Sequence, residues 1–460
     1  MVQTRPSVVV AGANGFVGRA LLPALQAEWH VIALSRGRTP GLDEAGVEWR
    51  RCDLYSLLEA EGALAGAEVA VYLVHSMLPS ARLTQASFED TDLILADNFA
   101  RAAAQAGVKQ IIYLGGLIPS GPELSRHLES RLEVERALGA YGVPVTALRA
   151  GMVIGAGGSS LDMLLTLVRR LPVMITPQWT RSSTQCVALD DVVGLIAFAA
   201  GNPETYGRHF DVGAPEVTSY RELMAITAQV LGKRRPMFSV PLFSPGLSKL
   251  WVSLITGQPM ALVYPLIDSL QHDMVAQELT LQAMAGRPAK PLREALAEAI
   301  AEEAARPKQR RSRQKPEAER DVRSIQRLTD PGLGDAEWVT HEYLRWLPIF
   351  LHPIIRVTYE GDQVRFMVPR DICLLELTYA RERSTSDRAL LYITGGRLAV
   401  VGEGRGRLEF RQLPDRGVYL VAIHDFTPRL PWWLYTLTQA KAHLVVMHAF
   451  GRHLKRLGRR

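Results

Sequence analysis

Three glycines at regular spacing near the start of the chain are well suited to holding a phosphate-bearing ligand. The β-branched run Ser7–Gly12 ends in Gly12, Gly15 and Gly18, and an amphipathic helical pattern follows. A dinucleotide pyrophosphate needs this order of strand, tight turn and helix, because the glycines permit the turn, the approach of backbone N–H groups to phosphate and close helix packing. A βα turn without ligand would explain the same glycines, but the flanks on both sides favour nucleotide binding.

The residues that end the second predicted strand bear on the choice of cofactor. Sites selective for NAD place an acid about 20 residues beyond the glycines, where it bonds the ribose 2′-hydroxyl. Here Ser35 and Arg36 occupy that position, and a guanidinium pairs with a 2′-phosphate through its planar fork. We therefore expect NADP rather than NAD; the alternative is that Arg36 is simply solvated. Asp53 and Leu54 follow the third strand, where a carboxylate accepts from the adenine amino group.

Strands and helices alternate from Ser7 to about Ile154. The predicted strands are Ser7–Gly12, His30–Ser35, Glu48–Cys52, Val69–Val74, Gln110–Gly115 and Val145–Leu148. Helical patterns fill the gaps, notably Gly15–Ala27, Asp90–Ala106 and Ser125–Tyr141. Such alternation produces right-handed βαβ crossovers, so we predict an α/β fold with a Rossmann-type doubly wound parallel sheet over residues 1–155.

The rest of the chain divides into three further regions. Residues 156–304 carry helical patterns and a Pro-punctuated apolar stretch, and we expect them on the substrate side of the same sheet. Residues 305–323 are polar and basic without apolar periodicity, which indicates a flexible linker. Residues 324–460 show consecutive strand patterns and end in one long amphipathic helix, Pro431–Leu457, whose apolar stripe includes Leu437. They predict a separate α+β domain in which the helix covers an antiparallel sheet.

Several motifs in the first 275 residues resemble the atypical (extended-type) short-chain dehydrogenase/reductase superfamily. They are GANGFVGRALL, CDL at 52–54, YLVHSM at 72–77, IIYLGGL at 111–117 and LRAGMVIG at 148–155. The chain is most similar there to the NmrA-like bacterial NAD(P)-binding proteins, through PVMITPQWTR, DDVV and GRHFDVGAPEVTSYREL. The tail motifs FTPRLPWWLYTL and AHLVVMHAFGRHL are similar to a helix-grip-like domain of unknown function appended in some of these proteins.

This resemblance implies a set of cofactor contacts at the glycine turn and at the carboxyl ends of the next strands. The candidates are Gly12, Asn14, Gly15, Phe16, Val17, Gly18, Ser35, Arg36, Asp53, Leu54, Val74, His75, Ser76, Gly115 and Gly116. His75 and Ser76 are either nicotinamide or ribose contacts or a pair that caps the loop. The resemblance places Trp179, Arg181 and Gln185 on the substrate-facing loop, although ordinary packing explains Trp179 equally well.

The catalytic positions depart from the superfamily pattern. Typical members use a serine, a tyrosine and a lysine four residues after the tyrosine, which passes a proton while hydride moves. Here the corresponding helix carries His127 and Arg131, and the serine position is occupied by Gly115 and Gly116. A spacing of four keeps His127 and Arg131 on one helix face. A histidine can relay protons near pH 7, whereas arginine binds but does not act as a base, so the pair is either catalytic or merely holds the cofactor.

Composition and charge set the remaining expectations. The 460-residue chain has a net charge of +6 and three widely spaced cysteines, which predict neither a disulfide framework nor a metal site. It contains no long apolar run that could span a membrane, so we expect a cytoplasmic protein. Lys441–Arg460 holds six Lys or Arg and no acid, beside Trp432 and Trp433. This helix therefore either grips its own sheet or touches an anionic membrane surface; no nucleic-acid recognition motif is present.

Three functions are compatible with these observations. The first is an NADP(H)-dependent oxidoreductase acting on a small apolar carbonyl substrate, with a degenerate active site. The second is a non-catalytic NAD(P)H-binding regulator or scaffold, as some NmrA-like proteins are. The third is a binder of a lipid or quinone-type ligand through the C-terminal domain. An apolar cavity inside the tail sheet would favour the third, and His127 facing the nicotinamide position would favour the first.

Overall fold

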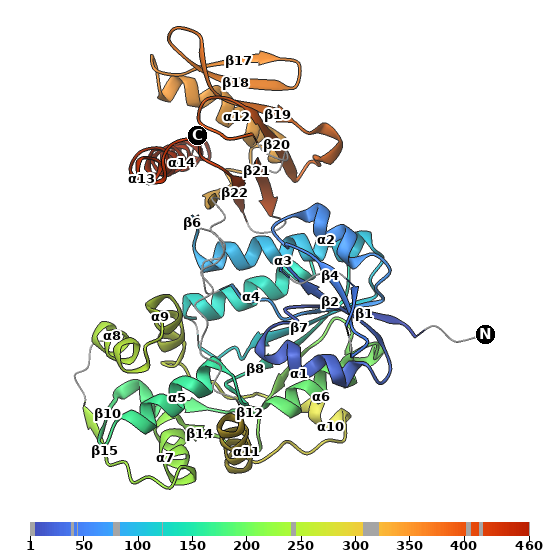
Figure 1. Cartoon of the computed structure of the whole chain (residues 1–460), viewed down its shortest axis with the longest axis vertical. Coiled ribbons are helices and arrows are strands. Elements are labelled where there is room, and N and C mark those ends of the chain that lie inside the picture. Colours follow the sequence, from blue (N-terminus) through green and yellow to red (C-terminus); the bar gives the residue numbers. More distant parts are fainter. Residues whose placement is uncertain are drawn as a thin grey trace. The chain divides into compact units, whose positions relative to one another are not determined.

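The computed structural model describes residues 5–37, 41–43, 45–76, 83–121, 123–240, 245–306, 322–401, 406–413 and 417–459. The chain divides into two compact units (Figure 1). The first comprises Met1–Leu78 and Leu95–Ser312, and the second comprises Pro79–Ile94 and Arg313–Arg460. The sequence patterns predict that Pro79–Ile94 belongs to the first unit. The internal boundaries expected at residues 155, 304 and 323 stay predictions.

The first unit is built on an eight-stranded sheet in the order β13-β8-β7-β5-β1-β2-β4-β3. Its strands are β1 (Ser7–Ala11), β2 (His30–Ser35), β3 (Gly41–Leu42), β4 (Glu48–Arg51), β5 (Val69–Tyr72), β7 (Gln110–Gly116), β8 (Val145–Ala150) and β13 (His209–Val212). Neighbouring strands run parallel apart from β3, which pairs antiparallel with β4. The Rossmann-type parallel sheet is therefore confirmed. Strand order reverses between β1 and β5, and ligands of such sheets bind outside the carboxyl ends of the strands at this switch point.

Helices cover both faces of this sheet (Figure 1). On one face lie α1 (Phe16–Leu25) and α6 (Leu189–Ala199), which contact each other and share an apolar core with β1 and β2. On the other lie α2 (Leu57–Leu64), α3 (Phe88–Gln105) and α4 (Arg126–Leu138). The predicted helices form within a few residues of their expected ends, and α2 is an addition. Its start is fixed locally, because the side chain of Ser56 accepts a hydrogen bond from the backbone N–H of Glu59.

The remainder of the first unit forms short sheets and helices around a separate apolar core. The strands are β9 (Val153–Ile154), β10 (Met174–Pro177), β11 (Ser183–Thr184), β12 (Val187–Ala188), β14 (Thr218–Ser219) and β15 (Met237–Val240). The helices are α5 (Ser159–Arg170), the 3-10 helix η1 (Gln178–Arg181), α7 (Tyr220–Val230), α8 (Pro245–Thr256), α9 (Met260–Ser269), α10 (Thr280–Met284) and α11 (Leu292–Ala305). The Pro-punctuated stretch Met237–Leu270 thus folds as β15, α8 and α9.

The second unit is a mostly antiparallel sheet in the order β17-β18-β19-β20-β21-β22-β16-β6, as predicted for an α+β domain. The strands are β6 (Leu83–Gln85), β16 (Val322–Thr329), β17 (Arg356–Glu360), β18 (Gln363–Val368), β19 (Ile372–Tyr379), β20 (Arg388–Gly395), β21 (Arg407–Leu413) and β22 (Val418–Phe426). One face is covered by α12 (Ala336–Phe350) and α14 (Gln439–Leu457), which share its apolar core. The inserted strand β6 extends the sheet by pairing parallel with β16.

Three expectations for the tail need correction. The predicted single helix Pro431–Leu457 is two helices, α13 (Trp432–Leu437) and α14, with a break at Thr438 where φ is −118° and ψ is −83°. Leu437, which we expected in the buried stripe, is 59% exposed because it lies on α13, outside the register of α14. Strand β16 begins at Val322 and takes in the last two residues of the predicted linker. Residues 307–321 of that linker lie outside the described residues.

Candidate functional site

The glycine turn after β1 has the geometry of a phosphate cradle. Gly12 has φ +86°, and a Cβ there would lie 2.9 Å from the backbone carbon of Leu73. A Cβ on Gly18 would lie 2.3 Å from the carbonyl oxygen of Gly12, and one on Gly15 would lie 3.0 Å from the same oxygen. The turn is closed by the N–H of Gly15, which donates to that carbonyl at 2.8 Å. Side chains are therefore excluded at Gly12 and Gly18 and would be crowded at Gly15, so that backbone forms the surface.

The start of helix α1 adds donors to this cradle. Its N-cap, Gly15, has no side chain to cap the helix, and its first turn contains no acid. The first N–H groups of a helix, here those of Phe16, Val17 and Gly18, have no partner within the helix and carry partial positive charge. A pyrophosphate would satisfy them without the strain that a side chain would cause. The cradle therefore fits a dinucleotide on geometry alone.

The neighbouring strand supplies the candidates for the adenosine half. Asn14 donates through Nδ2 to the hydroxyl of buried Ser35 at 2.9 Å, which fixes the turn against the end of β2. Arg36 follows directly and is exposed to solvent. The backbone N–H of Asp53 donates to the carboxylate of Glu59, whereas Leu54 is buried and its carbonyl accepts from Asn98 at 2.8 Å. Leu54 therefore contributes backbone and packing here.

The loop after β5 and helix α4 bring three predicted residues together. Arg131 is only 7% exposed and donates through Nη1 to Nδ1 of His75 at 3.0 Å. Its other terminal nitrogen donates to the carbonyl of Leu114 at 2.9 Å. The rings of His75 and His127 lie 5.2 Å apart. The expectation that His127 and Arg131 share one face is met, and His75 joins them.

The contact between Arg131 and His75 fixes the state of the imidazole. A guanidinium has only donors, so Nδ1 of His75 must accept and the ring proton of the neutral form lies on Nε2. This leaves His75 with an N–H group directed away from Arg131. Arginine stays charged and acts as no base. The arrangement therefore makes Arg131 a positioning residue and leaves the two imidazoles as the groups able to move a proton.

Tyr113 on β7 contacts Arg131 and so helps to hold this cluster in place. Its hydroxyl donates to the carbonyl of Arg131 at 3.1 Å, and the Arg131 guanidinium lies 5.0 Å from its ring centroid. Tyr113 is fully buried. A Cβ on Gly115 would lie 2.9 Å from the Tyr113 ring, and one on Gly116 would lie 3.8 Å from the Cγ of Arg131. Gly115 therefore allows the aromatic ring to approach the strand, whereas a side chain at Gly116 would make only an ordinary contact with Arg131.

The glycine turn and the cluster lie at the same end of the sheet. Gly12 packs against Leu73, and the N–H of Leu73 donates to the carbonyl of Ala11 at 3.0 Å. The half-buried Val74 and Ser76 flank His75 on the loop that continues from Leu73. The cluster thus stands at the switch point between β1 and β5, where the second half of a dinucleotide would extend.

The three substrate-loop candidates do not converge. Trp179 packs edge to face on Tyr220 with ring centroids 6.4 Å apart. This contact agrees with ordinary packing, the alternative to a substrate contact for Trp179. Arg181 is exposed. Gln185 is buried, and its amide donates to the carbonyl of Ala214 at 2.6 Å and accepts from the N–H of Ala276 at 2.9 Å. Both ends of that amide hold backbone, so Gln185 braces the loop.

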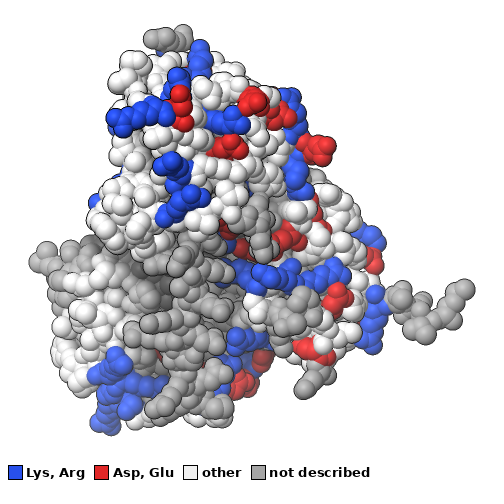
Figure 2. Space-filling view, turned by 45° about the horizontal axis from the view of Figure 1, so that its top comes forward, with Lys and Arg blue, Asp and Glu red and all other residues white. Residues whose placement is uncertain are grey.

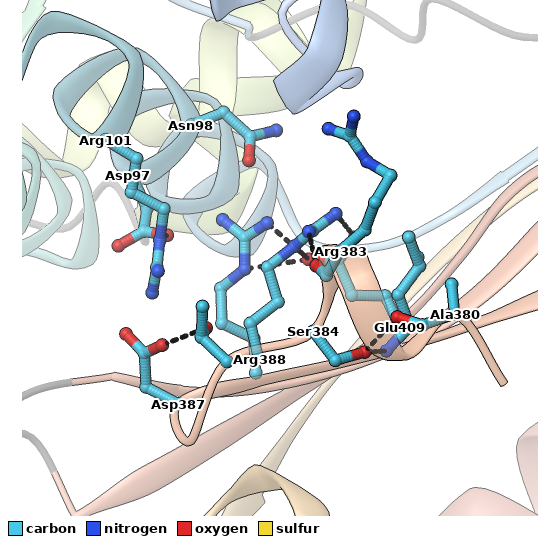
Figure 3. A network of polar contacts seen from close by, with 12 residues as sticks. Asp97, Asn98, Arg101, Ala380, Arg383, Ser384, Asp387, Arg388 and Glu409 are labelled. Atoms are coloured by element: carbon cyan, nitrogen blue, oxygen red, sulfur yellow. Dashed lines mark hydrogen bonds and ion pairs between the residues drawn. The ribbon is translucent and has the colours of Figure 1, made fainter. Parts of the chain in front are cut away.

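A second polar cluster lies on strands of the sheet of the second unit, on the face opposite to its apolar core (Figure 3). Glu409 on β21 is 1% exposed and accepts from Nε of Arg388 at 2.8 Å and from Nε of Arg411 at 2.9 Å. Burial alone would raise the pKa of Glu409, but the two guanidinium groups outweigh it and hold the pKa well below its usual range. Nearby His424 is fully buried, and burial followed by the charge of Arg407 lowers its pKa to about 3. These charges satisfy one another and so stabilise the sheet.

Sequence reasoning missed two features of the candidate site. The first is the bond between Arg131 and His75, which joins residues 56 positions apart, and the second is the hydrogen bond from the Tyr113 hydroxyl to the Arg131 carbonyl. His75 lies in the motif YLVHSM and Tyr113 lies in the motif IIYLGGL. The adjacency of β5 and β7 was the signal that could have placed these two residues close together. Among the described residues, no group of three His, Cys, Asp or Glu side chains could hold a metal ion. No described helix is both long and apolar enough to cross a membrane.

Comparison with known proteins agrees with the glycine cradle. Residues 12–154 match a family model described as NAD(P)H-binding. The chain is 33% identical over 142 residues to the auxiliary protein GraX of Staphylococcus aureus, a match covering 31% of this chain and 43% of that protein. It is 27% identical over 304 residues to a (4-alkanoyl-5-oxo-2,5-dihydrofuran-3-yl)methyl phosphate reductase of Streptomyces griseus, covering 63% of this chain and 97% of that enzyme. The match to the first of these relatives thus spans less than half of that protein's length.

The solved structures give the same fold. An NADPH-dependent quinone oxidoreductase of Escherichia coli, crystallised with NADPH, superposes with a TM-score of 0.51 at 18% identity, over 64% of this chain and 99% of that one. The first unit therefore contains an NAD(P)H-binding domain and shares its fold with this solved structure. The prediction of a nicotinamide cofactor is confirmed as NAD(P)H binding.

Proposed function

We propose that the first unit binds NADPH in preference to NADH. Arg36 is exposed at the position where NAD-selective sites carry an acid, and Asn14 anchors the preceding residue, Ser35, beside the glycine turn. The exposed guanidinium is free of the steric constraints of the core and pairs with a 2′-phosphate. The NADPH in the Escherichia coli neighbour supports this choice of cofactor.

Calorimetric titration of both cofactors tests this preference. The unmodified protein should bind NADPH at least tenfold more tightly than NADH. Arg36→Ala should remove that advantage while leaving NADH affinity nearly unchanged. Arg19→Ala is the matched control, because Arg19 is another exposed arginine of the same βαβ unit. Equal affinity for both cofactors in the unmodified protein would exclude the assignment.

We further propose that the protein is an oxidoreductase that reduces a small apolar carbonyl compound. One observation carries this proposal: the cluster of Arg131, His75 and His127 stands at the switch point beside the glycine turn. The bound nicotinamide would supply hydride. His127 is the proposed proton donor in place of the missing tyrosine, and His75 is held by Arg131 as its partner. The names of the Streptomyces relative, a reductase, and of the Escherichia structural neighbour, a quinone oxidoreductase, support the reaction class.

Turnover of NADPH with a panel of quinones, enones and aldehydes is the direct test. His127→Ala should lower kcat by about 10²–10⁴-fold, the range typical of a lost general acid. A His75→Ala/His127→Ala double variant should be little slower than the single one, because residues that act as a unit are not additive. Arg131→Lys should change the pH profile of kcat, because it alters the hold on His75. Full turnover in His127→Ala would assign the histidine a structural role.

A non-catalytic regulator is the second candidate. The specific observation in its favour is that Arg131, at the position of the usual lysine, is already engaged by Leu114 and His75. Tight NADPH binding without turnover of any carbonyl compound in the panel would select it. A ligand inside the second unit has less support, because the rings of Tyr343, Phe410 and Phe450 fill the space between helices and sheet at centroid distances of 5.1–5.4 Å.

A further inference from the structure

Helix α14 presents two different faces. Its inner face is buried against the sheet and α12 through Met447, Phe450 and Leu454. Its outer face is exposed and cationic. The exposed residues are Lys441, Val445, His448, Arg452, Lys455 and Arg456, with Arg459 directly after the helix. They recur at intervals of three or four residues, which places them along one side of the helix.

The positive charge of this outer face is not balanced by an acidic residue on α14 itself. No acidic residue follows Asp425 in the chain. Exposed arginines elsewhere in the second unit do pair with carboxylates, as Arg381 pairs with Asp362 at 2.6 Å and Arg356 with Asp371 at 2.7 Å. On α14, His453 lies 2.6 Å from a carboxylate oxygen of Glu342, whereas Arg452 and Lys455 are exposed and form no ion pair among the described residues. Figure 2 shows Lys and Arg side chains on the surface of the second unit, several of them beside Asp or Glu side chains.

Helix α13 places exposed apolar side chains next to the first turn of α14, the end of that helix that carries Lys441. Tyr435 of α13 is buried in the core, whereas Trp433 and Leu437, four residues apart, are 65% and 59% exposed. Val445 on the outer face of α14 is also 59% exposed. The break at Thr438 ends the register of α13 and lets its outer residues stay in solvent. Exposed apolar side chains rimmed by charged residues are typical of surfaces that contact a partner or a membrane.

We propose that α13 and the outer face of α14 form a docking surface for an anionic lipid bilayer. Phospholipid headgroups complement the unbalanced cations, while Trp433 and Leu437 enter the boundary between headgroups and acyl chains. Nucleic acid would match the charge but leave the apolar residues uncovered. The surface belongs to the second unit and does not depend on the proposed reductase chemistry. A reductase so attached would act on apolar substrates that partition into the membrane.

Flotation of the full chain with vesicles tests the proposal. The unmodified protein should float with vesicles containing phosphatidylserine in phosphatidylcholine, and not with phosphatidylcholine alone. Arg452→Gln/Lys455→Gln/Arg456→Gln should lower the apparent affinity at least tenfold. The control is Arg345→Gln/Arg356→Gln/Arg381→Gln, which removes the same charge from exposed, carboxylate-paired arginines of the same unit and should bind as the unmodified protein does.

A second pair of variants separates docking from nonspecific attraction of charges. Trp433→Ala/Leu437→Ala should lower affinity about tenfold at unchanged charge, and Trp433→Phe should restore part of it. Both side chains are exposed, so the variants should keep the unmodified thermal transition. The proposal is overturned if phosphatidylserine vesicles fail to float the protein, if both triple variants lose binding equally, or if Trp433→Ala/Leu437→Ala has no effect. Binding of a single-stranded RNA in place of vesicles, lost in the first triple variant, would also overturn it.

Discussion

In the first unit, polar side chains gather at the carboxyl edge of a parallel sheet, whereas in the second unit they lie on one face of an antiparallel sheet. Arg131 reaches His75 and a strand carbonyl at the edge, next to a helix start that no side chain caps. Glu409, by contrast, is enclosed by Arg388 and Arg411. The difference teaches that density of charge does not mark a ligand site. Buried charges that pair with one another need no ligand and are costly to break, while unfilled backbone donors at a helix start can bind one.

Glu409 offers the strongest test of this contrast. Glu409→Gln removes the carboxylate charge that Arg388 and Arg411 share in their buried contacts. Breaking such a buried pair costs about 3–5 kcal/mol. Hydrogen exchange measured by mass spectrometry should show faster exchange in β20, β21 and β22, with no change in β1 or β5. Similar protection in variant and parent would mean that the cluster does not stabilise the sheet.

The control for this variant is Glu360→Gln. Glu360 pairs with Arg365 at 2.7 Å in the same unit, but its side chain is 73% exposed. Exposed pairs contribute about 0–1 kcal/mol because water and salt screen them. The pKa of Glu409 is held low in the folded protein, so its stabilisation is present above the unfolded pKa and lost as pH falls through the folded one. The difference between the two variants should therefore shrink in acid.

The next largest expected effect is the pH dependence of stability that arises from His443. Burial lowers the pKa of His443 on α14 to about 4, while its Nε2 lies 3.1 Å from the hydroxyl of Ser324. Between about pH 6.5 and 4, His443 is protonated in the unfolded chain but not in the folded chain. The free energy of unfolding therefore falls as pH falls across this range. A shift of this size corresponds to about 3 kcal/mol.

His443→Gln should flatten this pH dependence in urea unfolding of the second unit. His448→Gln is the matched control on the same helix, because solvent reaches its ring. Part of the slope should remain, since His424 is also buried with a lowered pKa. An unchanged slope in His443→Gln would show that His443 is protonated in the folded protein.

The parts of the fold that follow local rules could be predicted from the sequence. The glycine spacing and the alternation of strands and helices predict the first sheet, and consecutive strand patterns predict the second. Strand β6 could not be predicted, because three residues carry no periodicity and its partner β16 lies more than 200 positions away. The break at Thr438 has no glycine or proline to announce it. Both features arise from tertiary packing.

The candidate site was predictable in its backbone half only. Gly12, Gly15 and Gly18 are required by close approach, which leaves a mark on the sequence. The side-chain half depends on which loops meet. Arg131 could be placed on its helix face, but its bond to His75 follows from the adjacency of β5 and β7. Gln185 was expected to face substrate, yet its amide holds two backbone groups that no motif reveals.

Gly18 tests the backbone half of the comparison. In Gly18→Val the new side chain would begin 2.3 Å from the carbonyl oxygen of Gly12, so the turn must open. Such overpacking costs about 1–3 kcal/mol in stability, and the opened turn should bind NADPH at least 100-fold more weakly. Gly62→Ala is the control, because Gly62 lies inside α2 with nothing within 4 Å. That variant should bind NADPH normally, and calorimetry on both proteins decides the question.

The ion pair between Arg327 and Asp90 is expected to have the smallest effect, and it tests whether the inserted strand belongs to the second unit. Nε of Arg327 on β16 lies 2.6 Å from Oδ1 of Asp90, with the Arg327 side chain 33% exposed. Asp90→Asn should therefore cost at most about 1 kcal/mol. Because Gln326 also holds the Gln85 carbonyl at 2.9 Å, β6 should stay paired with β16 while exchanging its amides only slightly faster. Complete loss of protection in β6, with β22 unchanged, would mean that this single pair holds the strand in the sheet.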